Sequence, residues 1–194
     1  MPPTLAIVIA AALGVLTWSF LEYCIHRWAG HDRRFRGNIF SKEHTAHHSQ
    51  GDYFAPAWKK GAAFALAVGL VAPPAIWLAG LGPGVAFALG LAGFYLAYEV
   101  LHRMEHVHAG IGAYGRWARR HHFHHHFANP ASNHGVTSPI WDFVFRTYEA
   151  PSTIQVPEKL AMVWLTDPAT GDVRPEHRHS YELRRRGSRR QAAA

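Results

Sequence analysis

Three long uncharged stretches occupy the first half of the chain and predict three membrane-spanning helices. Residues 4–21 hold 18 positions without a charge, residues 62–81 hold 20, and residues 82–98 hold 17. A helix needs about 20 predominantly apolar residues to cross a bilayer. We therefore expect the third helix to continue through Glu99 to about Leu101. The segment Leu81-Gly82-Pro83-Gly84 is the predicted turn between the second and third helices.

The basic residues lie in two regions and predict how these helices are oriented. All 20 lysines and arginines fall in residues 27–60 or from Arg103 onward. Cytoplasmic loops of membrane proteins carry such an excess, so we expect an integral, multi-pass membrane protein with both regions on the cytoplasmic face. No basic residue precedes Arg27, which disfavours a cleaved signal peptide. The net charge of +7 follows this topology, and we expect no nucleic-acid partner.

Sixteen of the 194 residues are histidine, and most fall into four clusters. Two membrane crossings separate the second cluster from the third, so all four can meet on the cytoplasmic side. Neutral imidazole is the commonest metal ligand in proteins, and the grouping predicts a metal site. The clusters are His26 and His31; His44, His47 and His48; His102 and His106; and the run HHFHHH at residues 121–126.

Helical spacing directs the histidines of a cluster toward one point. Residues at i, i+3 and i+4 share a helix face, and the second and third clusters have this spacing. The fourth run allows two registers, residues 121, 124 and 125 or residues 122, 125 and 126, and spacing alone does not choose between them. His26 and His31 are five apart, so we expect a helix end at Gly30 that lets each approach from a different angle.

Ten candidate ligands are too many for one ion, because a closed zinc site takes four. Two ions with about five nitrogens each is the simplest prediction, and imidazole suits iron, zinc, copper and nickel. No HExxH motif supports a zinc protease. We expect carboxylates to accept hydrogen bonds from the far ring nitrogens of the ligands. The candidates are Glu22, Glu43, Glu99, Glu105 and Asp142.

A metal pair beside apolar helices suits oxidation of a C–H bond in a lipid chain. Iron can activate O2 for such a reaction, whereas zinc has no redox chemistry. Ion transport is disfavoured, because the predicted spans hold no mid-span carboxylate or histidine. Metal binding without catalysis stays open as a less favoured alternative.

The order of the four clusters, HX4H, HX2HH, HX3H and HX2HH, resembles the membrane fatty acid hydroxylase/sterol desaturase superfamily. The flanking residues resemble its fatty acid 2-hydroxylase branch. In particular, GVTSPIWD at residues 135–142, followed by Phe145 and Thr147, resembles the closing signature of that branch. The likeness covers about residues 18–148.

This resemblance implies an all-α, integral membrane helical bundle with a cytoplasmic, histidine-rich helical cap that holds a dimetal site. The sequence predicts about three transmembrane helices, whereas members of the superfamily usually have four, so both numbers stay open. It implies a non-haem di-iron monooxygenase that acts on lipid. It also selects a register for the fourth run, in which His121 and His124 are neighbours of the ligands. The implied metal ligands are His26, His31, His44, His47, His48, His102, His106, His122, His125 and His126.

The implied cofactors are two iron ions, which zinc can replace in purified protein, and O2 as cosubstrate. Electrons are expected from a separate cytochrome b5-like protein or ferredoxin, because the chain has no His-Pro-Gly-Gly motif of a fused cytochrome b5 domain. The expected substrate is a fatty acyl chain of a membrane lipid, with Arg27, Arg103 and Arg120 as candidates to hold an acidic headgroup. A sterol, hopanoid, carotenoid or alkylglycerol substrate, and desaturation in place of hydroxylation, stay open.

The composition changes after the last motif and predicts two parts of the chain. We predict a membrane-embedded fatty acid hydroxylase-like domain at residues 1–150. A basic C-terminal extension follows at residues 151–194 and is expected to be partly disordered, from Arg184 onward.

Overall fold

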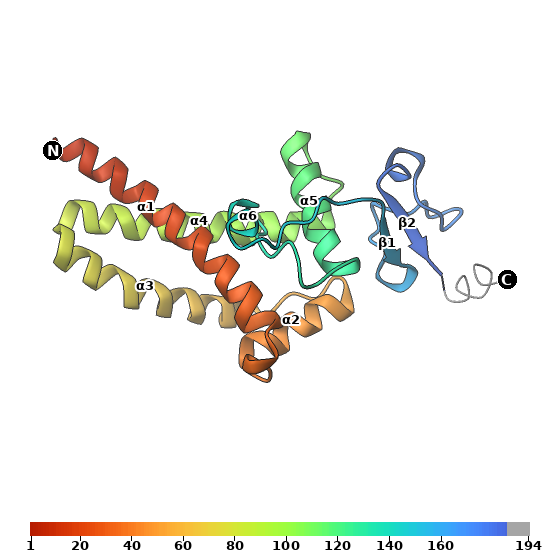
Figure 1. Ribbon diagram of the computed structural model, residues 1–194, viewed down its shortest axis with the longest axis horizontal. Coiled ribbons are helices and arrows are strands. Elements are labelled where there is room, and N and C mark those ends of the chain that lie inside the picture. Colours follow the sequence, from red (N-terminus) through yellow and green to blue (C-terminus); the bar gives the residue numbers. More distant parts are fainter. Residues whose placement is uncertain (186–194) are drawn as a thin grey trace.

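Three long helices form one end of the molecule in the computed structural model, which describes residues 1–185. They are α1 (Pro3–Cys24), α3 (Ala57–Ala79) and α4 (Leu81–Val107), and they lie side by side at the N-terminal end (Figure 1). The chain runs on from α1 through a π-helical segment, Ile25–His31. With that segment included, these three helices are long and apolar enough to cross a membrane, as predicted.

Glycines let α1 and α4 approach closely. A Cβ atom built on Gly90 would lie 2.1 Å from the carbonyl oxygen of Ala11, and one built on Gly14 would lie 2.1 Å from the carbonyl oxygen of Phe87. Small residues at such crossings are typical of helices that pack within a membrane. The contact of α1 with α4 fixes where the first histidine pair meets the later ones.

The connection between α3 and α4 is tighter than predicted. The helix break falls at Gly80, whose φ of 82° is in the left-handed region that glycine adopts readily. The expected turn at residues 81–84 is wrong, because α4 already begins at Leu81. Pro73 and Pro74 lie inside α3, and the helix continues through both of them to Ala79.

Two shorter helices carry the second and fourth histidine clusters. Helix α2 (Ile39–Gln50) follows a short 3-10 turn, Arg33–Phe35. Its N-terminus is capped by the Asn38 side chain, which accepts a hydrogen bond of 2.8 Å from the Ser41 backbone N–H. Helix α5 (Gly112–Phe127) carries the fourth cluster in its last two turns, and α6 (Ile140–Val144) is a single turn.

The C-terminal extension corrects the all-α expectation. Strands β1 (Ile154–Pro157) and β2 (Tyr181–Arg184) pair in parallel, with Ile154 opposite Tyr181. Two 3-10 turns, Glu158–Leu160 and Pro175–His177, lie between them. The strands are only four residues long, so their alternation of buried and exposed side chains is a weak signal in the sequence.

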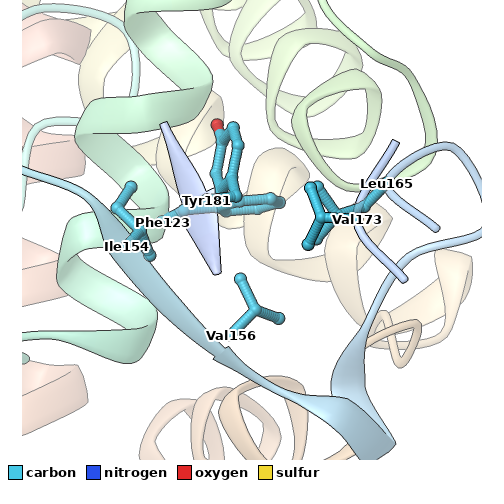
Figure 2. Close-up of a cluster of buried hydrophobic side chains, with 6 residues drawn as sticks. All are labelled: Phe123, Ile154, Val156, Leu165, Val173 and Tyr181. Atoms are coloured by element: carbon cyan, nitrogen blue, oxygen red, sulfur yellow. The ribbon is translucent and has the colours of Figure 1, made fainter. Parts of the chain in front are cut away.

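The sheet packs against α5 rather than forming a separate unit. Figure 2 shows the cluster, in which Phe123 of α5 meets Ile154, Val156 and Tyr181 of the extension. Phe123, Ile154 and Val156 are completely buried. The extension therefore supports the helix that carries the fourth histidine cluster. The disorder expected from Arg184 onward is wrong at Arg184, which ends β2, and residues 186–194 lie outside the described residues. The division at residue 150 stays a prediction.

Candidate metal centre

The structure brings together all ten histidines that the sequence singled out, in two groups of five. In each group every histidine contributes one ring nitrogen, and these five nitrogens all lie within 4.8 Å of one another. The first group, named here the α1 group, is His26, His31, His44, His48 and His125; the second, the α4 group, is His47, His102, His106, His122 and His126. Each group draws on at least three elements, so neither forms without the tertiary fold.

The π-helical segment explains how His26 and His31 join the same group. The predicted helix end at Gly30 is wrong, because helical backbone continues to His31. A π-helix forms i to i+5 hydrogen bonds, so residues five apart are brought close to the same side of the helix. The two rings have centroids 5.3 Å apart, whereas an α-helix would turn them to different sides.

The structure also distinguishes the two registers of the fourth cluster. His122, His125 and His126 enter the two groups, with His125 in the α1 group and its neighbour His126 in the α4 group. His121 turns away to the Asp142 carboxylate at 3.2 Å, and His124 turns to Glu149 at 2.9 Å. One helix thus contributes to both groups, because adjacent residues point about 100° apart around its axis.

Backbone carbonyls orient three of the ten rings. The Nδ1–H of His26 donates to the carbonyl of His134 at 2.6 Å, and that of His125 donates to Ser132 at 2.7 Å. In the α4 group the Nδ1–H of His47 donates to the carbonyl of Tyr53 at 2.7 Å. A neutral imidazole has one N–H, so each of these rings is left with a lone pair on Nε2.

Those lone pairs face other imidazole nitrogens. The Nε2 of His125 lies 2.8 Å from the Nε2 of His31, and the Nε2 of His47 lies 3.0 Å from that of His102. The Nε2 atoms of His26 and His126 are buried and have no hydrogen-bond partner in the described part of the chain. Buried polar atoms are rarely left unpaired, and a cation within each group would satisfy these nitrogens.

Burial keeps the rings in the form that binds metal. Burial, together with nearby imidazoles, lowers the pKa of His44, His122, His125 and His126 well below 6.5. Burial also lowers the pKa of His47 to about 4. These rings are therefore neutral at pH 7, and each offers a lone pair on one ring nitrogen to a metal ion. A donor set made only of imidazole fits iron, zinc, copper or nickel.

The two groups adjoin each other. The ring of His48, in the α1 group, stacks on that of His126, in the α4 group, with centroids 4.0 Å apart. His44 and His47, one turn apart on α2, also fall in different groups. The arrangement suits a pair of neighbouring ions better than two unrelated sites.

The segment Ser132–Thr137 holds two of the anchoring carbonyls, and buried carboxylates hold this segment. Asp142 accepts hydrogen bonds from the backbone N–H groups of His134 and Gly135 at 2.8 and 2.9 Å. Glu22 of α1 accepts from the backbone N–H of Thr137 at 2.8 Å. Burial opposes the charge of Asp142, but hydrogen bonds from His121, Gly135 and Thr147 outweigh it and lower the pKa of that carboxyl.

The expectation that carboxylates contact the far ring nitrogens of the ligands is wrong. Within the described residues, no carboxylate bonds to a ring nitrogen of the ten histidines, and those ring nitrogens that have a partner bond to backbone carbonyls or to one another. Glu43 pairs with Lys59 and Tyr53, and Glu99 pairs with Lys60. Both carboxylate oxygens of Glu105 are buried without a partner in the described part of the chain. The anchoring residues Ser132, His134 and Tyr53 act through backbone oxygens, which no residue type reveals.

A cavity of about 350 Å³ lies beside both groups, among α1, α2, α3 and α4. His44, His47 and His102 form its wall toward the metal groups. Its other walls are largely apolar and include Trp18, Ile25, Phe40, Phe54 and Ala63. Arg27, Arg103 and Arg120, the candidates to hold a headgroup, do not line it. The cavity can hold an apolar chain against the histidines.

Comparisons with known proteins agree on one family. Residues 11–147 match the fatty acid hydroxylase family. The chain is 31% identical to a fatty acid 2-hydroxylase of Homo sapiens, over 70% of this chain and 38% of that protein. It is also 31% identical to a ceramide very long chain fatty acid hydroxylase of Schizosaccharomyces pombe, over 70% of this chain and 41% of that protein.

A solved structure shows the same architecture. It is described as full-length scs7p with only the hydroxylase domain visible, and it superposes with a TM-score of 0.53 at 26% identity. The superposition covers 78% of this chain and 62% of that one. The chain spans about two fifths of the length of the human and fission-yeast relatives that it matches.

Proposed function

This chain belongs to the fatty acid hydroxylase family, and from that membership and the two histidine groups we propose that it hydroxylates a C–H bond of a fatty acyl chain. The observation that carries the proposal is the convergence of ten imidazoles into two adjoining groups beside an apolar cavity. The proposed reaction consumes O2 and takes electrons from a separate electron-transfer protein. The oxygen atom that does not enter the substrate leaves as water.

We propose iron as the native metal in both groups. Iron held by these imidazoles would supply the redox activation of O2 that an unactivated C–H bond requires. The α1 group would hold one ion and the α4 group the other, which agrees with the prediction of two ions with about five nitrogens each. The histidines serve as ligands, and their buried neutral rings are suited to that role rather than to acid–base catalysis.

The cavity residues would position the substrate. Phe40 and Trp18 present apolar surface to an acyl chain and exclude water from the metal-facing wall. His44, His47 and His102 border the same cavity, so a carbon held there lies beside both groups. Regiochemistry would follow from how deep the chain enters before its headgroup stops it.

The charges of the cavity wall favour an acyl chain in ester or amide linkage. Lys59 and Lys60 are the cations of this wall within the described residues, and each pairs with a glutamate that also lines it. The carboxylate of a free fatty acid would need a cation in the cavity, so it would have to break the ion pair of Lys59 or of Lys60. The neutral carbonyl of an ester- or amide-linked acyl chain needs no cation. The headgroup of such a lipid could stay at the membrane surface.

Mass spectrometry of total lipids tests the proposed reaction. Cells that express the chain are compared with cells that express a variant with His125→Ala and His126→Ala, one ligand of each group. We expect acyl chains that gain one oxygen atom, and loss of that product in the variant. A product that lacks two hydrogens would instead assign a desaturase, and the same lipids from both cells would overturn the proposal.

A further inference from the structure

A second cavity, of about 590 Å³, lies between α5 and the C-terminal extension. Arg116, Trp117 and Arg120 of α5 form one side, and the segment from Glu176 to Tyr181 forms the other. None of the ten histidines of the two metal groups lines it. It is therefore separate from the cavity beside the metal centre, and the proposed hydroxylation does not use it.

Positive charge gathers on the α5 side of this cavity. Arg116, Arg119 and Arg120 have the spacing i, i+3 and i+4, which places them on one helix face. Among the described residues no carboxylate forms an ion pair with any of the three. Glu176 is the one acidic residue that lines the cavity in the described part of the chain. The cavity thus has an excess of cations.

Two of the arginines are held in place by neighbouring groups. The Nε–H of Arg119 donates to the Tyr181 hydroxyl at 3.0 Å, and its guanidinium lies 4.2 Å from the centre of the Trp164 ring. Arg120 donates through an Nη2–H to the carbonyl of Pro151 at 2.7 Å. These contacts fix the positions of both side chains, so the charge is preorganised.

Donors remain unused around the same cavity. The Nε of Arg120 is buried and has no acceptor within the described residues, and the same holds for the hydroxyl of Ser180. Ser180 is 2% exposed, and its backbone groups are already paired with His177 and Ile154. Arg116 is exposed and unpaired within the described chain, so its whole guanidinium is free to bind an anion.

We propose that this cavity binds a phosphate group. Phosphate carries several acceptor oxygens, and guanidinium binds it through paired hydrogen bonds. The free guanidinium of Arg116 would supply the first donors, and Arg120 and Ser180, which also line the cavity, each hold a buried donor without a partner in the described chain. Ala109 and Gly110 line the cavity shortly after α4 ends at Val107, on the same side of the predicted third span as the histidine groups. The phosphate can belong to a phospholipid headgroup or to a soluble phosphate compound.

Calorimetric titration of the detergent-solubilised full chain tests the proposal. One titration uses inorganic phosphate, and the other uses a short-chain phosphatidic acid with the matching diacylglycerol, which lacks the phosphate, as the blank. We expect saturable binding in at least one titration, weakened about tenfold by Arg116→Gln, since charge-assisted hydrogen bonds are the strong ones. Binding of phosphatidic acid alone identifies a headgroup site, and binding of inorganic phosphate identifies a site for soluble phosphate.

Two further variants keep the test decisive. Ser180→Ala removes an unsatisfied buried hydroxyl, so we expect it to fold at least as well as wild type and yet bind phosphate several-fold more weakly. Arg36→Gln is the matched control, because Arg36 is exposed and does not line the cavity. Absence of saturable binding by wild type, or equal losses in Arg116→Gln and Arg36→Gln, would overturn the proposal. Metal content and thermal midpoint, measured in parallel, show that each variant is folded.

Discussion

The ring of His26 and the backbone of His134 are joined by a hydrogen bond of 2.6 Å from Nδ1 to the carbonyl oxygen, across 108 positions of sequence. This bond leaves the Nε2 of His26 as a lone pair directed into the α1 group. His134 is not in either metal group. Its contribution comes from the backbone, and the Asp142 carboxylate holds that backbone in place.

Replacement of Asp142 tests this indirect support. In Asp142→Asn an amide N–H₂ would face the backbone N–H of His134 or Gly135, which now bond to the two carboxylate oxygens. We expect a loss of about 1–3 kcal/mol in stability, the cost of unsatisfied buried polar groups. We also expect faster loss of metal to a chelator. The exposed Glu182→Gln serves as the control, and equal behaviour of the two variants would refute the role of Asp142.

Gly90 tests the packing that positions α1. A Cβ there would lie 2.1 Å from the backbone oxygen of Ala11, so Gly90→Ala must push α1 away from α4. We expect a destabilisation of about 1–3 kcal/mol, as for an overpacked core, measured as a lower thermal midpoint in detergent. Gly93 of the same helix is a matched control, because nothing lies within 4 Å of its Cβ position and Gly93→Ala should be neutral or stabilising.

Trp164 connects the C-terminal extension to the α4 group. Its Nε1–H donates to the backbone carbonyl of His106 at 2.9 Å. Trp164→Phe removes this bond and keeps most of the ring packing. We expect about a fivefold weaker affinity of one metal ion, the equivalent of about 1 kcal/mol for one hydrogen bond. Trp77 is 83% exposed, so Trp77→Phe should leave the affinities for both metal ions unchanged.

The size of the first cavity should limit the substrate. Ala63 lines it, and its neighbour Ala62 does not. Ala63→Trp fills part of the 350 Å³ with an indole ring, so we expect at least a tenfold loss of hydroxylated lipid at unchanged metal content. Ala62→Trp should retain the product. Full activity in Ala63→Trp would show that the acyl chain binds elsewhere.

The histidines and long helices could be predicted from the sequence because their signals are local. Residue type and spacing predicted the clusters of α2 and α4, and the resemblance to a known family selected His122 over His121. The orienting groups left no such signal, because His134 and Ser132 contribute carbonyl oxygens that every residue has. The expected carboxylate contacts were wrong for the same reason, since a charged residue near a ligand reveals nothing about where it points.

The π-helical segment and the small sheet were missed for different reasons. Spacing rules for helices assume the α-helical repeat, so a pair of histidines five residues apart suggested a helix end at Gly30. Strands β1 and β2 have only four residues each and pair across a long connection, so their pairing depends on the buried contact with Phe123. Tertiary contacts decided both features.

The most direct test of the two-metal account is a count of bound metal by elemental mass spectrometry in purified protein and in three single variants of α5. We predict two ions per chain in wild type and in His124→Ala, whose ring turns to Glu149. We predict a loss of at least one ion in His125→Ala and in His126→Ala, which belong to different groups. A wild-type chain that binds one ion or none, or a loss in His124→Ala equal to that in His125→Ala, would contradict the account.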